Sequence, residues 1–230
     1  LTAASSATGR LTKLRASINE KGLIEALDYD QIDDVGAYPR APEPASLYRM
    51  HGNLSGAYKV KNIRCRNRVV LTNKTPSGLN RGFGGPQHYF ALERLVHQIA
   101  VELNLNVLDV IKVNLLEKKQ FPYKSPSGAL LDSGDFQKLV KKVVKSSTYK
   151  NILKKKNDAI KNGKIYGIGY SAIIEPSISN MGYVTTALPY KDREKTGHKG
   201  GALASTSVSI GPTGSVYVTC DSLPQGQGHK

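Results

Sequence analysis

The chain has 230 residues, enough to bury a substantial core, which suits one large domain or two small ones. Hydrophobic residues make up 39% of it, and no run reaches the roughly 20 apolar residues that a membrane helix needs. Cys65 and Cys220 lie far apart and lack metal-ligand spacing, so we expect a reducing, cytoplasmic location without an iron–sulfur or structural zinc site in this chain.

The net charge of +15 would ordinarily suggest a nucleic-acid partner. However, residues 138–164 hold ten Lys and one Asp, and this local excess of +9 is more than half of the total. These lysines alternate with apolar residues at helical spacing, so we interpret them as the solvated face of two helices. Aromatic residues that could stack on bases are not interleaved with them, and we expect neither a nucleic-acid nor a membrane partner.

The first part of the chain is patterned as strands. Residues 10–38 predict a β-hairpin that turns at 19–22, and residues 58–72 predict further strands. The returning strand carries four acidic residues, which we expect to face solvent because the spacing of a calcium loop is missing: Asp28, Asp30, Asp33 and Asp34. Arginines alternate with apolar residues in the later strand and are expected to face water or a partner subunit: Arg64, Arg66 and Arg68.

A glycine-rich turn, residues 80–87, leads directly into a helix predicted over Tyr89 to Asn104. Three glycines in five residues allow positive φ and a close ligand approach, and Pro86 suits the first helical position. A helix start with Arg81 beside it favours a phosphate or another anion. A tight turn that only packs is the alternative.

Further elements follow this helix. Asn106 and Asp109 have the spacing of a capping box, Asp132-Ser133 can start the next helix, and the two lysine-rich helices come after it. The periodicity then changes to two, which predicts a strand over Ile165 to Ile174 and a hairpin over Ala202 to Cys220. His88 and His97 are nine residues apart, too far for a helical metal pair, and are expected to be core or surface residues.

These elements predict an α+β protein of mixed hairpins and sheets with a cluster of four helices in the middle. We expect residues 1–84 to be mainly β, residues 85–163 mainly α and residues 164–230 mainly β. A second glycine-rich turn, Gly226-Gln227-Gly228, lies near the end of the last part, where the glutamine can present an amide donor and an acceptor.

The order of several short motifs resembles the molybdenum-binding large subunit of the xanthine dehydrogenase/aldehyde oxidase family, over nearly the whole chain. The motifs are Thr72-Asn73, Arg81-Gly82-Phe83-Gly84-Gly85-Pro86-Gln87, Ala91-Leu92-Glu93-Arg94-Leu95, Phe121-Pro122-Tyr123, Asp132-Ser133-Gly134-Asp135, Gly167-Ile168-Gly169 and Gly226-Gln227-Gly228-His229. The resemblance implies molybdopterin, or its cytosine dinucleotide form, as the cofactor that carries molybdenum. It also implies iron–sulfur and FAD groups on partner subunits or domains.

The resemblance also assigns residues. Arg81 and Gly82 would bind the pterin, with Gly226, Gln227 and Gly228 forming the second cofactor loop. Phe83 and Tyr170 would pack on the substrate ring, with Ser171 beside them, and Arg49 would orient the substrate. Packing roles are the alternative for each. If the assignment is right, Arg81 and Gln227 should face one cleft.

The implied activity is hydroxylation of an aldehyde or an N-heteroaromatic substrate with water as the oxygen source. Gly82 stands where carbon monoxide dehydrogenases of this family carry a cysteine, which argues against carbon monoxide chemistry. The family's base, a glycine-flanked glutamate, is expected downstream, so the chain resembles the middle of the subunit, contains no catalytic residue or metal ligand, and would be inactive alone. Two alternatives stay open: a non-catalytic assembly module of the same fold, and a basic nucleic-acid-binding protein.

Overall fold

A computed structural model describes residues 9–39, 49–174, 190–193, 205–222, 226 and 228 of the chain. It contains two compact units, Leu1–Glu175 and Pro176–Lys230. The first unit contains β1 (Gly9–Ile18), β2 (Ile24–Asp34), η1 (Arg49–Asn53), β3 (Asn62–Val70), α2 (Gly85–Glu102), α3 (Val107–Asn114), η2 (Lys118–Gln120), β4 (Tyr123–Lys124), β5 (Leu130–Leu131), α4 (Phe136–Lys145) and α5 (Ser147–Lys161). The second unit contains α6 (Tyr190–Arg193), β6 (Thr206–Ile210) and β7 (Val216–Cys220).

The three-stranded sheet of the first unit has the order β1-β2-β3. The predicted hairpin is confirmed, because β1 and β2 pair antiparallel around a turn in which Asn19 Oδ1 accepts from the Lys21 and Leu23 amides at 3.0 and 3.1 Å. The side-chain period of two gives this sheet an inner and an outer face. β3 pairs with β2 in parallel, after a connection that contains η1.

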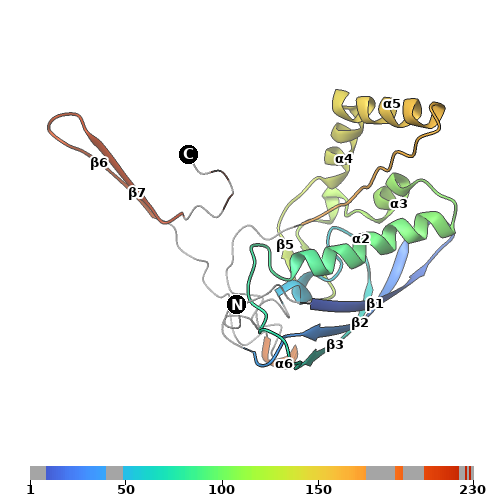
Figure 1. The fold of residues 1–230 in the computed structure, drawn as a ribbon, viewed down its shortest axis with the longest axis horizontal. Coiled ribbons are helices and arrows are strands. Elements are labelled where there is room, and N and C mark those ends of the chain that lie inside the picture. The colour runs from blue at the N-terminus through green and yellow to red at the C-terminus, as the bar shows by residue number, and fades with distance from the viewer. Residues whose placement is uncertain are drawn as a thin grey trace. The chain divides into compact units, whose positions relative to one another are not determined.

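The core lies between the inner face of the sheet and α2, which runs across it (Figure 1). Leu27 and Tyr29 of β2 and Leu92, Val96 and Ile99 of α2 are all at most 4% exposed. The three helix residues, Leu92, Val96 and Ile99, recur at i, i+4 and i+7, as the sequence predicts. The α+β class and the four central helices are confirmed: they are α2, α3, α4 and α5.

The predicted acidic face is wrong at one position. Asp28 and Asp30 lie on the outer face, where they pair with Arg64 and Arg68 at 2.6 Å. Asp33 instead has the same phase as Tyr29, and its side chain is 0% exposed. An inward carboxylate on a buried strand needs a charge partner that lies far away in the sequence, and local spacing does not reveal it.

One predicted helix start differs, and one predicted capping box is not closed. α4 begins after Asp135, whose carboxylate accepts from the Lys138 amide at 3.0 Å, rather than at Asp132-Ser133. Asn106 caps α3 as predicted by accepting from the Leu108 amide at 2.8 Å, whereas the Asp109 carboxylate pairs with Lys112 instead of closing a capping box. Asp132, Ser133 and Asp135 are all residue types that favour the position before a helix, and the position of the first helical turn decides which of them is the cap.

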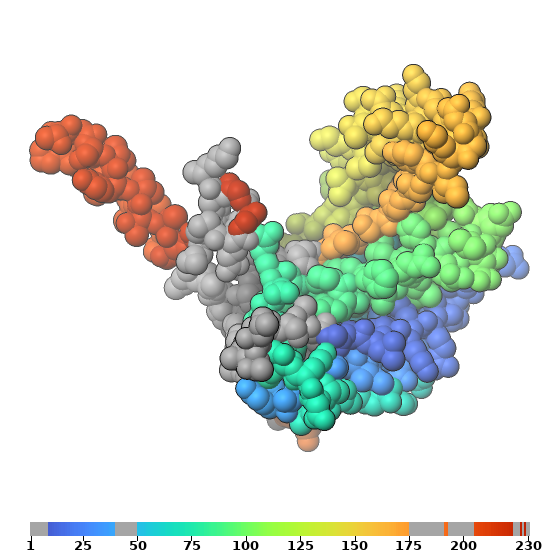
Figure 2. Space-filling view, viewed as in Figure 1, coloured from blue at the N-terminus to red at the C-terminus, as the bar shows by residue number. Residues whose placement is uncertain are grey.

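The predicted strand over residues 165–174 is wrong, because no part of this segment pairs with a strand in the described chain. It runs from the end of α5 back along α2 (Figure 1 and Figure 2). The β6–β7 hairpin is confirmed, with its turn at 211–214 and Gly214 at a φ of 81°. The lysines of α4 are exposed, in agreement with a solvated face. Among the described helices, none combines the length and apolar composition needed to span a bilayer.

Candidate functional site

The glycine turn at the start of α2 is built from two left-handed glycines. Gly82 has a φ of 84° and Gly84 has a φ of 80°, and residues other than glycine rarely adopt these backbone angles. The Gly85 amide donates to the Gly82 carbonyl at 2.8 Å, which closes the turn. Gly84 is the residue that precedes the helix, and among the described residues no side chain caps α2, so the positive end of the dipole of an 18-residue helix lies at this turn.

The outer side of this turn fits a phosphate-bearing ligand. A Cβ added at Gly82 would meet nothing within 4 Å, so a ligand can reach the backbone there. Arg81 is exposed beside it and Phe83 is half-buried. A backbone open to close approach, the positive end of a helix dipole and a guanidinium together suit an anionic group such as a pterin pyrophosphate.

The other predicted cofactor loop belongs to the second unit. Gly226 and Gly228 have left-handed φ values of 86° and 83°, as a glycine turn requires, while Gln227 between them lies outside the described residues. The convergence of Arg81 and Gln227 therefore stays a prediction. Arg49 is the first residue of η1, and its side chain also lies outside the described part.

Tyr170 lies at the middle of α2 rather than at the glycine turn. Its ring stacks on His97 at a centroid distance of 6.4 Å, and its hydroxyl is 3.2 Å from that of Tyr149. At about 1.5 Å per residue, the helix rises about 18 Å between Gly85 and His97, so the structure places Tyr170 and Phe83 at different positions along α2. Tyr170 and the exposed Ser171 line an apolar cavity of about 580 Å³ beneath α4.

Comparison with known proteins identifies the chain. The model of the molybdopterin cofactor-binding domain matches residues 1–115, which is half of the chain. The chain belongs to this family. The resemblance to the xanthine dehydrogenase/aldehyde oxidase family is thereby confirmed.

Individual relatives agree with this. The chain is 29% identical over 218 residues to the carbon monoxide dehydrogenase large chain of Hydrogenophaga pseudoflava, covering 91% of this chain and 26% of that one. It is 24% identical to the nicotine 6-hydroxylase large subunit of Paenarthrobacter nicotinovorans, covering 100% and 27%. Quinoline 2-oxidoreductase from Pseudomonas putida 86 matches with a TM-score of 0.74 and 25% identity, over 99% of this chain and 28% of that one. The chain thus spans about a quarter of the length of these relatives.

The molybdopterin domain contains a buried carboxyl group that the sequence analysis did not single out. Glu93 of α2 is 7% exposed, and burial raises its pKa to about 7. The Tyr58 hydroxyl lies 3.0 Å from both of its oxygens, and the Ala172 amide donates to Oε2 at 3.0 Å. A charged residue inside the apolar stripe of α2 was the signal that could have found it.

A buried polar cluster lies under the same helix. The Arg10 guanidinium donates to both oxygens of Asp33 at 2.6 and 2.9 Å, and Asn67 Nδ2 donates to Asp33 at 2.8 Å. Beside this pair, His51 Nε2 lies 3.2 Å from Gln31 Oε1. Burial and the Arg10 charge lower the pKa of His51 to about 4, so it is neutral at physiological pH.

His88 of α2 closes this cluster. It is 0% exposed, its ring centroid is 5.7 Å from that of Tyr29, and burial with the Arg10 charge lowers its pKa to about 3. Its two ring nitrogens, Nδ1 and Nε2, have no hydrogen-bond partner among the described residues, and neither do three buried polar atoms of cross-strand neighbours in the sheet: Thr12 Oγ1, Gln31 Nε2 and Asn67 Oδ1. Neutral histidine is the form that such a site tolerates.

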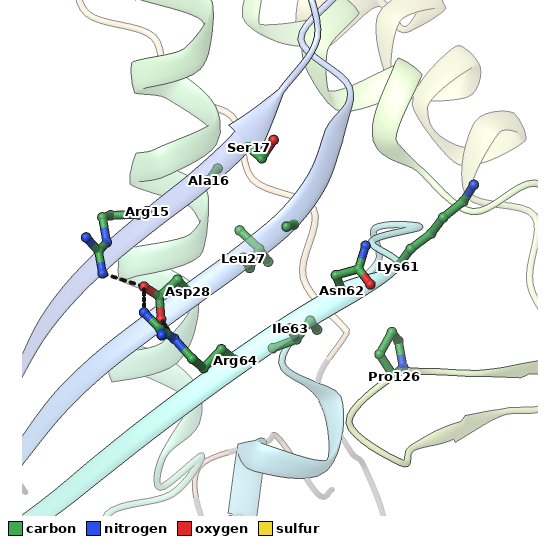
Figure 3. Close-up of a pocket in the computed structure, with 11 residues that line it drawn as sticks. Arg15, Ala16, Ser17, Leu27, Asp28, Lys61, Asn62, Ile63, Arg64 and Pro126 are labelled. Carbon is green, nitrogen blue, oxygen red and sulfur yellow. Dashed lines mark hydrogen bonds and ion pairs between the residues drawn. The ribbon is translucent and has the colours of Figure 1, made fainter.

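The outer face of the sheet has a different, open character. A depression of about 630 Å³ lies there, with the carboxylate of Asp28 held between Arg15 and Arg64 (Figure 3). Both guanidiniums are directed at this carboxylate, and the Arg64 bonds hold the pKa of Asp28 well below its usual range. Three cationic side chains, Arg15, Arg64 and Lys61, line the depression together with the single carboxylate of Asp28, so this lining has a net charge of +2. Both guanidiniums are already bonded to Asp28, and the family resemblance assigns no cofactor residue to this face.

Proposed function

We propose that this chain forms part of the cofactor-binding wall of a molybdenum hydroxylase. The observation that carries the proposal is the glycine turn at the start of α2, open to close approach at Gly82, in a chain of the molybdopterin cofactor-binding family. When bound, molybdopterin supplies a molybdenum centre that hydroxylates an electron-poor carbon with oxygen from water. The chain's own residues bind and orient; no base or metal ligand is assigned to them.

Each candidate residue has one proposed role. Arg81 pairs with anionic oxygen atoms of the cofactor, while Gly82 leaves room for its approach to the backbone. Gln227, between Gly226 and Gly228, provides an amide donor and acceptor from the second loop. Phe83 is half-buried next to the turn and provides an aromatic edge for the substrate.

The substrate class is proposed to be an N-heteroaromatic compound or an aldehyde. Two relatives are named for nicotine and quinoline, both N-heteroaromatic, which supports the first class. Gly82 argues against carbon monoxide despite the similarity to a carbon monoxide dehydrogenase. Tyr170, Ser171 and Arg49 remain proposed substrate residues; they would act from the cavity beneath α4 and from η1.

We propose further that the whole enzyme works in the cytoplasm with iron–sulfur and flavin partner subunits or domains that accept the electrons. The names of two relatives, "large chain" and "large subunit", support a multi-subunit assembly. The cofactor is molybdopterin or its cytosine dinucleotide, and mass analysis of the released pterin distinguishes the two. This chain on its own is expected to be inactive.

The proposal predicts that Arg81→Gln lowers the molybdenum and pterin content of the purified full-length complex. A charge-assisted bond to a buried anion contributes enough for about a tenfold weaker retention of the cofactor. Metal analysis and pterin fluorescence measure both contents directly, without relying on activity. Arg94→Gln is the matched control, because Arg94 is an exposed arginine within α2, away from the turn that carries Arg81.

The same measurement tests the alternatives. A full-length complex that contains neither molybdenum nor pterin would support the non-catalytic assembly module. Equal cofactor loss in Arg81→Gln and Arg94→Gln would remove the role assigned to Arg81. A salt-sensitive affinity for DNA or RNA would instead support the basic nucleic-acid-binding protein.

A further inference from the structure

Three polar side chains of α2 bond to the main chain of one segment. The Tyr89 hydroxyl donates to the Ile174 carbonyl, and Glu93 Oε2 accepts from the Ala172 amide at 3.0 Å. His97 Nε2 lies 2.8 Å from the Tyr170 carbonyl and 3.3 Å from its amide, and the shorter distance assigns Nε2–H as a donor to the carbonyl. The three helix residues are spaced at i, i+4 and i+8, and the contacted residues are alternate ones.

The spacing of the three side chains along the helix matches the spacing of the main-chain groups that they contact. Four residues of an α-helix rise about 6.0 Å, and two residues of an extended chain rise about 6.6 Å. Alternate residues of an extended chain direct their amides and carbonyls to the same side, so one row of side chains on one helix face can reach them. This explains how Tyr170, Ala172 and Ile174 bond through their main chain without a neighbouring strand.

We propose that Tyr89, Glu93 and His97 form a binding site for an extended peptide main chain, which residues 170–174 occupy, and that Glu93 sets its register. We call these three side chains the α2 row. The site serves as a positioning device for Tyr170 and Ser171, and only this last consequence rests on the proposed function. Residues in the α2 row are positioning residues, since none of them is placed against the cofactor.

Glu93 is the member that discriminates between registers. A shift of one residue turns the amide and carbonyl groups away from the helix, and the buried carboxylate would lose its donor. A shift of two residues restores the pattern but moves Tyr170 by about 6.6 Å, away from His97 and Tyr149. A buried carboxylate that needs two donors, Tyr58 and Ala172, therefore excludes the shift of one residue, and the contacts of Tyr170 exclude the shift of two.

A pair of proline substitutions in the full-length protein tests the site. Ala172→Pro removes the amide that Glu93 binds, whereas Ile173→Pro removes an amide that makes no hydrogen bond within the described chain. Hydrogen–deuterium exchange of the amides of residues 166–174 is the readout. We expect Ala172→Pro to accelerate exchange at the remaining amides about tenfold, and Ile173→Pro to change it little.

Glu93 variants complete the test. Glu93→Leu keeps the side-chain volume but removes the acceptor, so it is expected to accelerate exchange as much as Ala172→Pro does. The variant that combines Glu93→Leu and Ala172→Pro should exchange no faster than either one alone. Glu93→Gln keeps an acceptor for the Ala172 amide and should restore most of the protection. Tyr89→Phe, which removes one hydroxyl only, gives a milder loss and keeps the test valid if Glu93→Leu does not fold.

Two results would overturn the inference: equal effects of Ala172→Pro and Ile173→Pro, or an Ala172 amide that exchanges as fast as a free peptide in the unmodified protein. Its failure is distinguishable from failure of the proposed function, because the Arg81 measurement reports cofactor content and this one reports exchange at residues 166–174. Protection of the segment in a protein without molybdenum would support the α2 row while counting against the enzyme.

Discussion

Asp33→Ala is expected to lower the free energy of unfolding by about 3–5 kcal/mol, the cost of breaking a buried ion pair. The side chains of Arg10 and Asp33 are 2% and 0% exposed, and their two bonds of 2.6 and 2.9 Å are parallel. Alanine at position 33 removes both acceptor oxygens and leaves the guanidinium charge in the interior. Asn67 Nδ2 loses its acceptor as well. Urea unfolding monitored by circular dichroism measures the change.

Asp28→Ala is the matched control on the opposite face of the same strand. Asp28 also accepts from two guanidiniums, yet its partners Arg15 and Arg64 are 75% and 68% exposed, so water replaces the lost bonds. We expect a much smaller loss for Asp28→Ala than for Asp33→Ala. Similar losses in both variants would show that burial does not govern the Arg10–Asp33 pair. The double variant Arg10→Met/Asp33→Leu, which removes both charges, should recover most of the stability.

The contrast between these two aspartates shows what the sequence could and could not predict. The alternation of β2 was readable, because each strand position is either inward or outward, and it correctly placed Asp28 and Asp30 outside. Asp33 follows the inward phase, but a carboxylate there is acceptable only with Arg10 of β1 and Asn67 of β3 beside it. That pairing depends on the sheet order, which no local pattern contains.

In the candidate site, too, some features could be predicted from the sequence and others could not. The glycine turn was predictable because positive φ, a proline at the helix start and a neighbouring arginine are all local features of residues 81–86. The α2 row was not, since its partners are residues 170–174, which follow three further α-helices, α3, α4 and α5. The period of two in this segment was real, but it reflects alternate bonding to helix side chains rather than pairing with a strand.

The wild-type molybdopterin domain is expected to lose about 3 kcal/mol more stability than His88→Gln when the pH falls from 7 to 4. The pKa of His88 is about 3 in the folded chain, against 6.5 as its ordinary value. Between these values the unfolded chain binds a proton that the folded chain does not, so folding stability decreases as the pH falls. At about 1.36 kcal/mol per pH unit, the interval from 6.5 to 4 gives this magnitude. Glutamine does not titrate, so the difference between the two unfolding curves isolates His88.

The unfolding free energies of the wild type and of His88→Gln have to be compared with each other, because other groups titrate in the same pH range. His51 has a lowered pKa of about 4 and adds to the loss at low pH. Glu93 has the opposite sign: its raised pKa of about 7 means that the folded chain binds the extra proton, so its contribution is present below pH 4.5 and is lost as the pH rises through 7. Glu93→Gln should therefore shift the curve opposite to His88→Gln. A pH-independent difference between wild type and His88→Gln would mean that His88 binds its proton equally in the folded and the unfolded chain, and the burial of His88 and the Arg10 charge argue against that.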